Sequence, residues 1–256
     1  MSDSILFNVS DGIARITLNR PERLNAINAE AAYRWRDIAA EVATRPDISA
    51  VIFDAAGRAF CAGGDVLAMS QLGTERTSAG EAVHALATVI HDGHRSLRES
   101  SKPIVAAVQG TVVGGGLGFM LVADVIVASE RASFASKYAD IGLTPDCGVS
   151  TLLPDAVGTR HALELLLTPR TLSAAEALEW GLVTEVVAAD AVADRAQRIA
   201  QHWRGGASAA FGHAKRLVHA GRGRSFQESL DDEAATIGAA FDTAEAGARI
   251  AAFVAR

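Results

Sequence analysis

The sequence predicts an α/β protein with a mainly parallel sheet, followed by a helical C-terminal region. Short apolar runs at 51–53, 104–108 and 125–127 are typical of buried strands, and longer segments with helical spacing lie between them. Strands that alternate with helices in this way form parallel sheets whose faces the helices cover. We therefore divide the chain into an α/β core, residues 1–190, and a helical C-terminal region, residues 191–256.

Turn and capping residues define the first elements. Two β-prone runs, 5–9 and 13–19, flank Asp11-Gly12, a pair that favours a hairpin turn. Asn28 can then cap a helix over 29–44, because its side chain can accept a hydrogen bond from an amide of the first turn. The chain is expected to open with a hairpin and to continue into a βαβ unit.

Proline and glycine mark the next unit. A helical pattern over 81–98 ends before Pro103, the strand 104–108 follows, and the glycine-rich stretch 110–118 leads into another helix. Segment 71–80, which is rich in Thr, Ser and Gly, has the composition of a mobile loop. Beyond residue 190 we expect helices at 191–203, 207–220, 226–241 and 244–254.

Composition excludes several classes of function. Of 256 residues, 30 are acidic and 24 are Lys or Arg, without a basic block, so we expect no nucleic-acid partner. Cys61 and Cys147 fit neither a disulfide framework nor a metal-ligand spacing, so we expect free thiols and no metal. No apolar stretch is long enough for a membrane helix and no secretory leader pattern is present, which predicts a cytoplasmic protein without a membrane partner.

Two glycine-containing segments, 58–65 and 109–118, each follow a strand and precede a helix. Small residues let a ligand approach the backbone, and the exposed amides of a helix N-terminus can stabilise an oxyanion. Taken alone, the first segment also fits a tight turn with Asp65 as a helix cap. The second lacks both the dinucleotide-binding spacing and the Lys-Ser/Thr of a phosphate-binding loop, which disfavours nucleotide binding.

Four motifs together resemble the signature of the crotonase (enoyl-CoA hydratase/isomerase) superfamily in order and spacing. They are RPERLNAI at 20–27, FCAGGD at 60–65, KPIVAAVQG at 102–110 with the glycines 114–116 and Ala123-Asp124, and IGLTP at 141–145. The resemblance covers roughly residues 5–220.

The resemblance implies a crotonase (ClpP-like) fold of repeated ββα units and a homotrimer or hexamer, with residues 191–256 as the trimerisation region. It implies an acyl-CoA thioester as substrate, so that coenzyme A is part of the substrate and no separate cofactor is needed. The thioester oxygen would bind the amides of Ala62 and Gly115. The coenzyme A arm would follow Arg23, Leu24, Ala26, Ala62, Asp65 and Val66. Arg23 also fits a solvated surface charge.

Catalytic carboxylates set the reaction within this superfamily. Similar hydratases carry glutamates at the positions that match Gly118 and Tyr138, and efficient hydration normally needs two positioned carboxyls. One carboxylate remains beside the expected acyl path, Asp146, in a Pro-Asp-x-Gly context similar to the phenylacetate-pathway isomerase subgroup. In that subgroup the aspartate shuttles protons, whereas a related coenzyme A dehalogenase uses it as a nucleophile. Asp146 also fits a helix N-cap.

Other polar residues fit structural roles better. The histidines 84, 91 and 94 share one expected helix, lack a metal-ligand pattern and are interpreted as polar-face residues. Cys61 is interpreted as a small buried hydrophobe rather than a nucleophile. Similar isomerases continue past a stretch like 253–256 into a short tail, so a contact of this end with the coenzyme A 3′-phosphate is either lost or supplied by Arg256.

The sequence therefore favours an enoyl-CoA isomerase that moves a double bond through an enolate, with Asp146 as acid and base. Other reactions of the superfamily use the same enolate, including hydration, epoxyacyl-CoA isomerisation and dehalogenation. A non-catalytic acyl-CoA-binding homologue is the alternative from another class, and the two missing glutamates suggest it.

Overall fold

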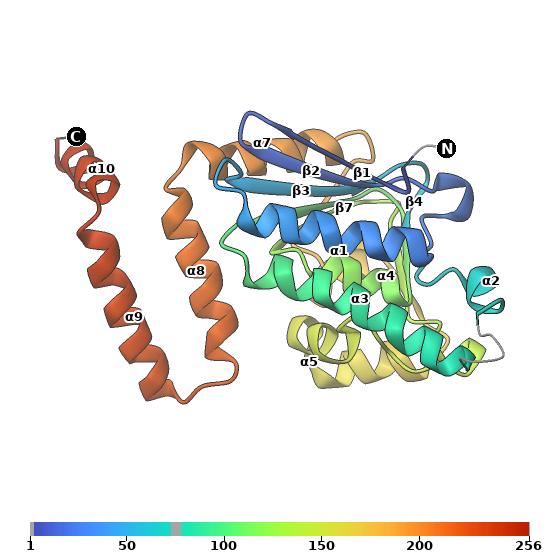
Figure 1. Cartoon of the computed structure of the whole chain (residues 1–256). Coiled ribbons are helices and arrows are strands. Elements are labelled where there is room, and N and C mark those ends of the chain that lie inside the picture. The colour runs from blue at the N-terminus through green and yellow to red at the C-terminus, as the bar shows by residue number, and fades with distance from the viewer. Residues whose placement is uncertain (1–2, 73–77, 256) are drawn as a thin grey trace.

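The computed structural model describes residues 3–72 and 78–255. Six strands form the main sheet (Figure 1), in the order β1-β2-β3-β5-β7-β10. Their bounds are β1 Ile5–Ser10, β2 Ile13–Leu18, β3 Ala50–Ala55, β5 Ile104–Val108, β7 Val125–Ser129 and β10 Glu185–Val187. The first two strands form an antiparallel hairpin and every later pairing is parallel. The predicted hairpin and parallel sheet are confirmed.

Helices cover both faces of this sheet. α7 (Val192–Gly205) packs on one face, where Ile52 belongs to the same apolar cluster as Val192 and Ala196. On the opposite face, the neighbouring Val51 and Phe53 belong to the larger core, together with α1 (Ala29–Thr44) and α3 (Ala79–Glu99). The alternation follows from the pleat, which points successive side chains to opposite faces. Thus α7, although it lies beyond residue 190, packs as part of the core.

A second, smaller sheet carries the two glycine-containing segments, in the order β4-β6-β8-β9. Its strands are β4 Ala59–Cys61, β6 Thr111–Val113, β8 Ser133–Ala135 and β9 Thr171–Ser173. β4 pairs in parallel with β6, and β6 with β8. Sequence analysis missed this sheet, because three residues are too few to show a period and β6 lies inside the stretch 110–118 that was expected to be a connection.

Local capping explains where the main helices begin. The Asn28 side chain accepts a hydrogen bond from the Ala31 amide at 2.9 Å, as the sequence predicted for α1. Ser78 and Glu81 form a capping box at the start of α3, so residues 79 and 80 are helical. The mobile-loop prediction for 71–80 otherwise falls largely on 73–77, which lie outside the described residues. Four more helices belong to the core: α2 Val66–Met69, α4 Gly115–Leu121, α5 Val149–Leu167 and α6 Ala174–Glu179.

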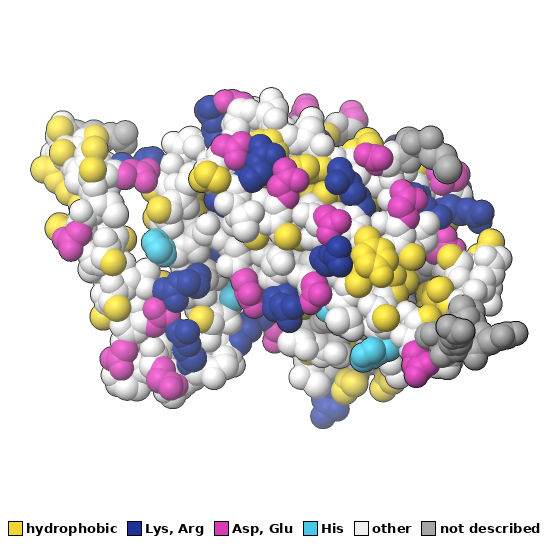
Figure 2. All heavy atoms as spheres, viewed as in Figure 1, with side chains coloured by type: hydrophobic (Ala, Val, Ile, Leu, Met, Phe, Trp, Pro, Cys, Tyr) yellow, Lys and Arg dark blue, Asp and Glu magenta, His cyan; other side chains and the backbone are white. Residues whose placement is uncertain are grey.

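Three further helices form an arm at one end of the molecule: α8 (Ser208–Gly221), α9 (Phe226–Phe241) and α10 (Ala244–Val254). α8 lies beside the core, and α9 and α10 extend beyond it (Figure 1). In the described structure no residue of α9 or α10 is buried. Large apolar side chains are therefore exposed on the arm (Figure 2), among them Phe226, Ile237, Phe241, Phe253 and Val254.

His94 is buried in the core between α1 and α4, so its interpretation as a polar-face residue is wrong. Its Nδ1 accepts a hydrogen bond from Trp35 Nε1 at 3.0 Å, and its ring packs edge-on against Phe119. The apolar surroundings penalise a charged imidazole, and with the nearby His91 they lower the pKa of His94 from 6.5 to about 3. This histidine therefore stays neutral in the folded protein.

The depressed pKa predicts that stability falls in mild acid. Below pH 6.5 the unfolded chain protonates His94 while the folded chain does not until about pH 3. Neutral His94 therefore makes its full contribution to the free energy of unfolding above pH 6.5. As the pH falls below 6.5, this free energy decreases by up to about 1.4 kcal/mol per pH unit. Urea unfolding between about pH 5 and pH 7.5 measures this slope. His94→Asn keeps an acceptor for Trp35 and should flatten the slope; an unchanged slope contradicts the account.

Candidate functional site

The two glycine-containing segments meet backbone to backbone. Gly63 has a φ of 87°, and a Cβ added there would lie 2.9 Å from the Val113 carbonyl oxygen and 3.1 Å from the Gly115 amide nitrogen. A Cβ added at Gly116 would lie only 2.3 Å from the Cys61 carbonyl oxygen. Glycine is required at these positions because any side chain would separate the segments. The turn after β4 is thereby held against the N-terminus of α4.

A cavity of about 440 Å³ opens at this junction. The backbone of residues 62–64 and 113–115 lines one wall. Residues of α2, α3 and the segment 136–146 line the rest. Six of them are apolar, Val66, Met69, Val83, Ala87, Ile141 and Leu143, and Ser136 and Lys137 are among the polar ones. The cavity therefore joins a row of backbone amides to an apolar chamber, which is the arrangement that a thioester with an apolar acyl group needs.

The amide of Ala62 is not available to a ligand, which corrects the sequence prediction. It donates a hydrogen bond of 3.0 Å to the Leu24 carbonyl oxygen. Within residues 3–72 and 78–255, no acceptor is bonded to the amide of Gly64 or of Gly115, and both residues line the cavity. The amides of Gly64 and Gly115 are therefore free to bind a ligand in this cavity.

Asp146 lies beside Gly115. A Cβ added at Gly115 would lie 3.5 Å from Asp146 Oδ1 and 3.6 Å from the Tyr138 hydroxyl. That hydroxyl donates a hydrogen bond of 2.6 Å to Asp146 Oδ1. The alternative role as a helix cap is excluded, because α5 begins at Val149 with Gly148 as its N-cap and without a side-chain cap. The carboxylate is half-buried and borders the cavity.

The neighbours of Asp146 fill the two positions at which similar hydratases carry glutamates. A Cβ added at Gly118 would lie 2.1 Å from the Cys147 carbonyl oxygen, so the turn 146–148 occupies the space of a larger side chain. At the second position, burial and the charge of Asp146 raise the pKa of Tyr138 far above its usual range, which keeps its hydroxyl protonated as a donor.

A second carboxylate, Asp140, also lines the cavity, and sequence analysis missed it. Asp140 is exposed and forms an ion pair of 3.0 Å with Lys137. The sequence does show two acidic residues close together in this segment, which could have indicated a second candidate acid. Only the structure of the loop shows that both border the cavity. Asp146 differs from Asp140 because Tyr138 fixes its carboxylate beside Gly115.

The residues expected along the coenzyme A arm do not all lie in one place. Arg23 and Asp65 line a shallow surface cavity of about 270 Å³, together with Arg20, whose Nη2 pairs with Asp65 Oδ2 at 2.9 Å. Val66 instead lines the cavity of about 440 Å³. Ala26 is buried, and Leu24 offers its carbonyl to Ala62, so neither side chain is shown to face a ligand. The contacts to coenzyme A stay predictions, and Arg256 lies outside the described residues.

Two buried cysteines flank the glycines of α4. Burial raises the pKa of Cys61 to about 12 and that of Cys147 well above its usual range. Both are therefore thiols rather than thiolates near neutral pH, and neither is suited to nucleophilic attack. The Cys147 amide donates a hydrogen bond of 3.1 Å to Nε2 of His91, so His91 contacts the site and is not simply a polar-face residue.

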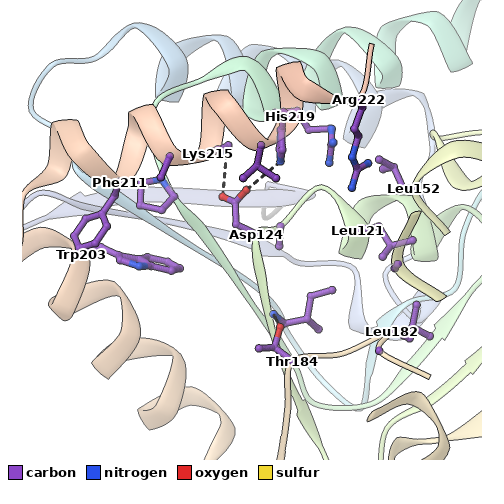
Figure 3. A pocket seen from close by; sticks show the side chains of 18 residues that line it. Leu121, Asp124, Leu152, Leu182, Thr184, Trp203, Phe211, Lys215, His219 and Arg222 are labelled. Atoms are coloured by element: carbon purple, nitrogen blue, oxygen red, sulfur yellow. Dashed lines mark hydrogen bonds and ion pairs between the residues drawn. The ribbon is translucent and has the colours of Figure 1, made fainter. Parts of the chain in front are cut away.

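A separate cavity of about 470 Å³ lies between α8 and the core (Figure 3). Near its centre Lys215 Nζ pairs with Asp124 Oδ2 at 3.0 Å, with His219 on the other side of the carboxylate. Lys215 also donates hydrogen bonds to the carbonyls of Leu97 and Lys102, so its ammonium group is fully used in joining α8 to the core. We therefore interpret the contacts at the centre of this cavity as structural.

The chain belongs to the enoyl-CoA hydratase/isomerase family, whose model matches residues 8–256, and it has the crotonase fold. It is 32% identical to 1,2-epoxyphenylacetyl-CoA isomerase of Escherichia coli K12, over 91% of this chain and 88% of the relative. It is 34% identical to (E)-benzylidenesuccinyl-CoA hydratase of Thauera aromatica, over 77% and 75%. A solved enoyl-CoA hydratase from Mycobacterium smegmatis superposes with a TM-score of 0.91 at 25% identity, covering 99% and 96% of the two chains.

Isomerases and hydratases both occur among these relatives, so membership of the family leaves the reaction to be argued from the site. The family itself processes acyl-CoA thioesters, which makes a coenzyme A thioester the substrate of this chain. Among the described helices, none is long and apolar enough to cross a membrane.

Proposed function

We propose that this enzyme is an enoyl-CoA isomerase, which moves the double bond of an acyl-CoA thioester. The observation that carries the proposal is the position of the Asp146 carboxylate, beside Gly115 and bound to the Tyr138 hydroxyl. A single fixed carboxylate next to an oxyanion site is sufficient to remove a proton and to return the same proton elsewhere.

The mechanism begins with the thioester oxygen bound between the amides of Gly64 and Gly115. Asp146 takes a proton from the α or γ carbon, and the electrons of that bond pass into a dienolate. The two amides stabilise the negative oxygen, with a contribution of about 3 kcal/mol per donor in comparable sites. Tyr138 binds Oδ1 of Asp146, which leaves Oδ2 to accept the proton and to return it at the other end of the shifted double bond.

Hydration fits this site less well. It needs one group to activate water and another to protonate carbon. The turn 146–148 fills the space beside Gly118, and the second hydratase position holds Tyr138, a neutral donor. Asp140 is exposed and paired with Lys137, which makes it a poor substitute for a positioned acid.

Epoxide rearrangement of an epoxyacyl-CoA is the second candidate, because the relative from Escherichia coli is named for it. It would use the same oxyanion amides and the same carboxylate. In either case, the walls formed by Val66, Met69, Val83 and Leu143 suit an apolar acyl group.

A panel of coenzyme A thioesters tests the reaction. We expect 3-enoyl-CoA to be converted to 2-enoyl-CoA at constant mass, and trans-2-enoyl-CoA to gain water at least about a hundredfold more slowly, since loss of a positioned acid or base costs 10² to 10⁴. Mass spectrometry detects added water and NMR locates the double bond. Comparable rates of the two reactions would defeat the proposal, and rearrangement of epoxyacyl-CoA alone would select the second candidate.

Asp146→Asn tests the proton carrier. Asn keeps the shape and can still bind the Tyr138 hydroxyl, but it cannot take a proton, so turnover should fall by about 10² or more while thioester affinity changes little. Calorimetry with a non-reactive acyl-CoA measures the affinity. Asp140→Asn, the other cavity-lining carboxylate, is the matched control and should stay within about threefold of wild type. Near-normal turnover of the Asp146 variant would remove the assignment.

We further propose that residues 191–256 assemble the chain into a trimer or hexamer, as the resemblance implied. The exposed apolar side chains of α9 and α10 support this, because they have no packing partner within the described chain. Light scattering at micromolar concentration should give three or six times the mass of the chain. The pair Ile237→Asp and Phe241→Asp should lower that mass, whereas a wild-type monomer would contradict the proposal.

A further inference from the structure

His91 connects helix α3 to the turn that carries Asp146. Its side chain is exposed on one side, yet Nε2 accepts a hydrogen bond of 3.1 Å from the Cys147 amide. A ring nitrogen of His91, a carboxylate oxygen of Asp146 and the Cys147 sulfur lie within 4.8 Å of one another. The grouping could suggest a metal site, but the lone pair of Nε2 is already engaged by the amide. The hydrogen bond is therefore the interaction that has to be explained.

The peptide that His91 binds has an uncommon conformation. Cys147 has a φ of 52° and Gly148 a φ of 78°, so two successive residues after Asp146 are left-handed. Left-handed backbone is unfavourable for a residue that has a Cβ, and it persists only where the surroundings enforce it. Cys147 is not a glycine, so its left-handed conformation is strained. Contacts with other parts of the chain are therefore needed to hold this peptide in place. The carbonyl oxygen of this peptide, that of Asp146, accepts hydrogen bonds from the Val149 amide at 2.9 Å and from the Tyr138 hydroxyl at 3.4 Å.

Two helices also contact the turn. On one side, Nε2 of His91 on α3 accepts from the Cys147 amide. On the other, α4 presents Gly118, where the Cys147 carbonyl oxygen and Cβ would lie 2.1 Å and 2.6 Å from an added Cβ. The contact with Gly118 only limits how far the turn can move. The hydrogen bond to His91 is directional and fixes the orientation of the peptide.

The direction of the Asp146 carboxylate depends on that peptide, because Asp146 and Cys147 share it. We propose that His91 is a positioning residue, whose Nε2 holds the strained turn 146–148 so that the Asp146 carboxylate faces the oxyanion amides. This inference rests on the proposed role of Asp146 in proton transfer. His91 itself touches no reacting atom.

Three variants on α3 test the inference. His91→Leu removes the acceptor, whereas His91→Gln places a carbonyl oxygen near the position of Nε2 and should restore the bond. His84→Leu is the matched control, since His84 is an exposed histidine two turns earlier on the same helix. We expect His91→Leu to lower kcat about tenfold or more with KM within about twofold. We expect the Gln variant and the His84 control to stay within about threefold of wild type.

A double-mutant cycle distinguishes positioning from a general structural role. If His91 acts through Asp146, His91→Leu should lower turnover no further in a protein that already carries Asp146→Asn. An equal further loss in that background would overturn the inference, as would wild-type kcat of His91→Leu alone. If Asp146→Asn retains turnover, the proposed function fails first, and the cycle reports that separately.

Thiol reactivity provides a readout that does not depend on turnover. Cys147 is 3% exposed and Cys61 is fully buried in the core. Release of the turn should make Cys147 react with a maleimide at least about tenfold faster in His91→Leu than in wild type or His91→Gln. Cys61 serves as the internal control and should stay unreactive. Unchanged labelling of Cys147 in His91→Leu would overturn the proposed hold on the turn.

Discussion

The close contact between the turn at Gly63 and the N-terminus of α4 is the constraint on which the rest of the site depends. The parallel pairing of β4 with β6 places the two segments side by side. A Cβ at Gly63 would lie only 2.9 Å from the Val113 carbonyl oxygen and 3.1 Å from the Gly115 amide nitrogen, so this contact requires glycine. Because Leu24 and Ile27 take the amides of Ala62 and Asp65, the amide of Gly64 is left beside that of Gly115.

In the proposed mechanism, the residue that serves as acid and base is determined by the limited space beside α4. The turn after Asp146 occupies the volume beside Gly118, so a carboxylate enters the cavity from this turn and not from the helix. Tyr138 then binds that carboxylate with a hydroxyl that burial keeps protonated. A site with one such fixed carboxylate suits the transfer of a proton between two carbons better than the addition of water.

Periodicity and capping predicted the larger elements, because these signals are local. Asn28 defined the start of α1, and the buried runs defined β3, β5 and β7. The second sheet was missed because its strands have three residues each. The resemblance implied the amide of Ala62, but the partner of that amide, the Leu24 carbonyl, is distant in sequence and only the structure shows it. The burial of His94 was missed for the same reason, since it depends on α4.

A crystal structure with a non-reactive acyl-CoA thioester analogue tests the central claim most directly. The account predicts that the carbonyl oxygen lies about 2.7 to 3.1 Å from the amide nitrogens of both Gly64 and Gly115. It also predicts that the Asp146 carboxylate faces the α and γ carbons. An oxygen bound to the amide of Ala62, or an acyl group held in the cavity beside Lys215, would contradict it.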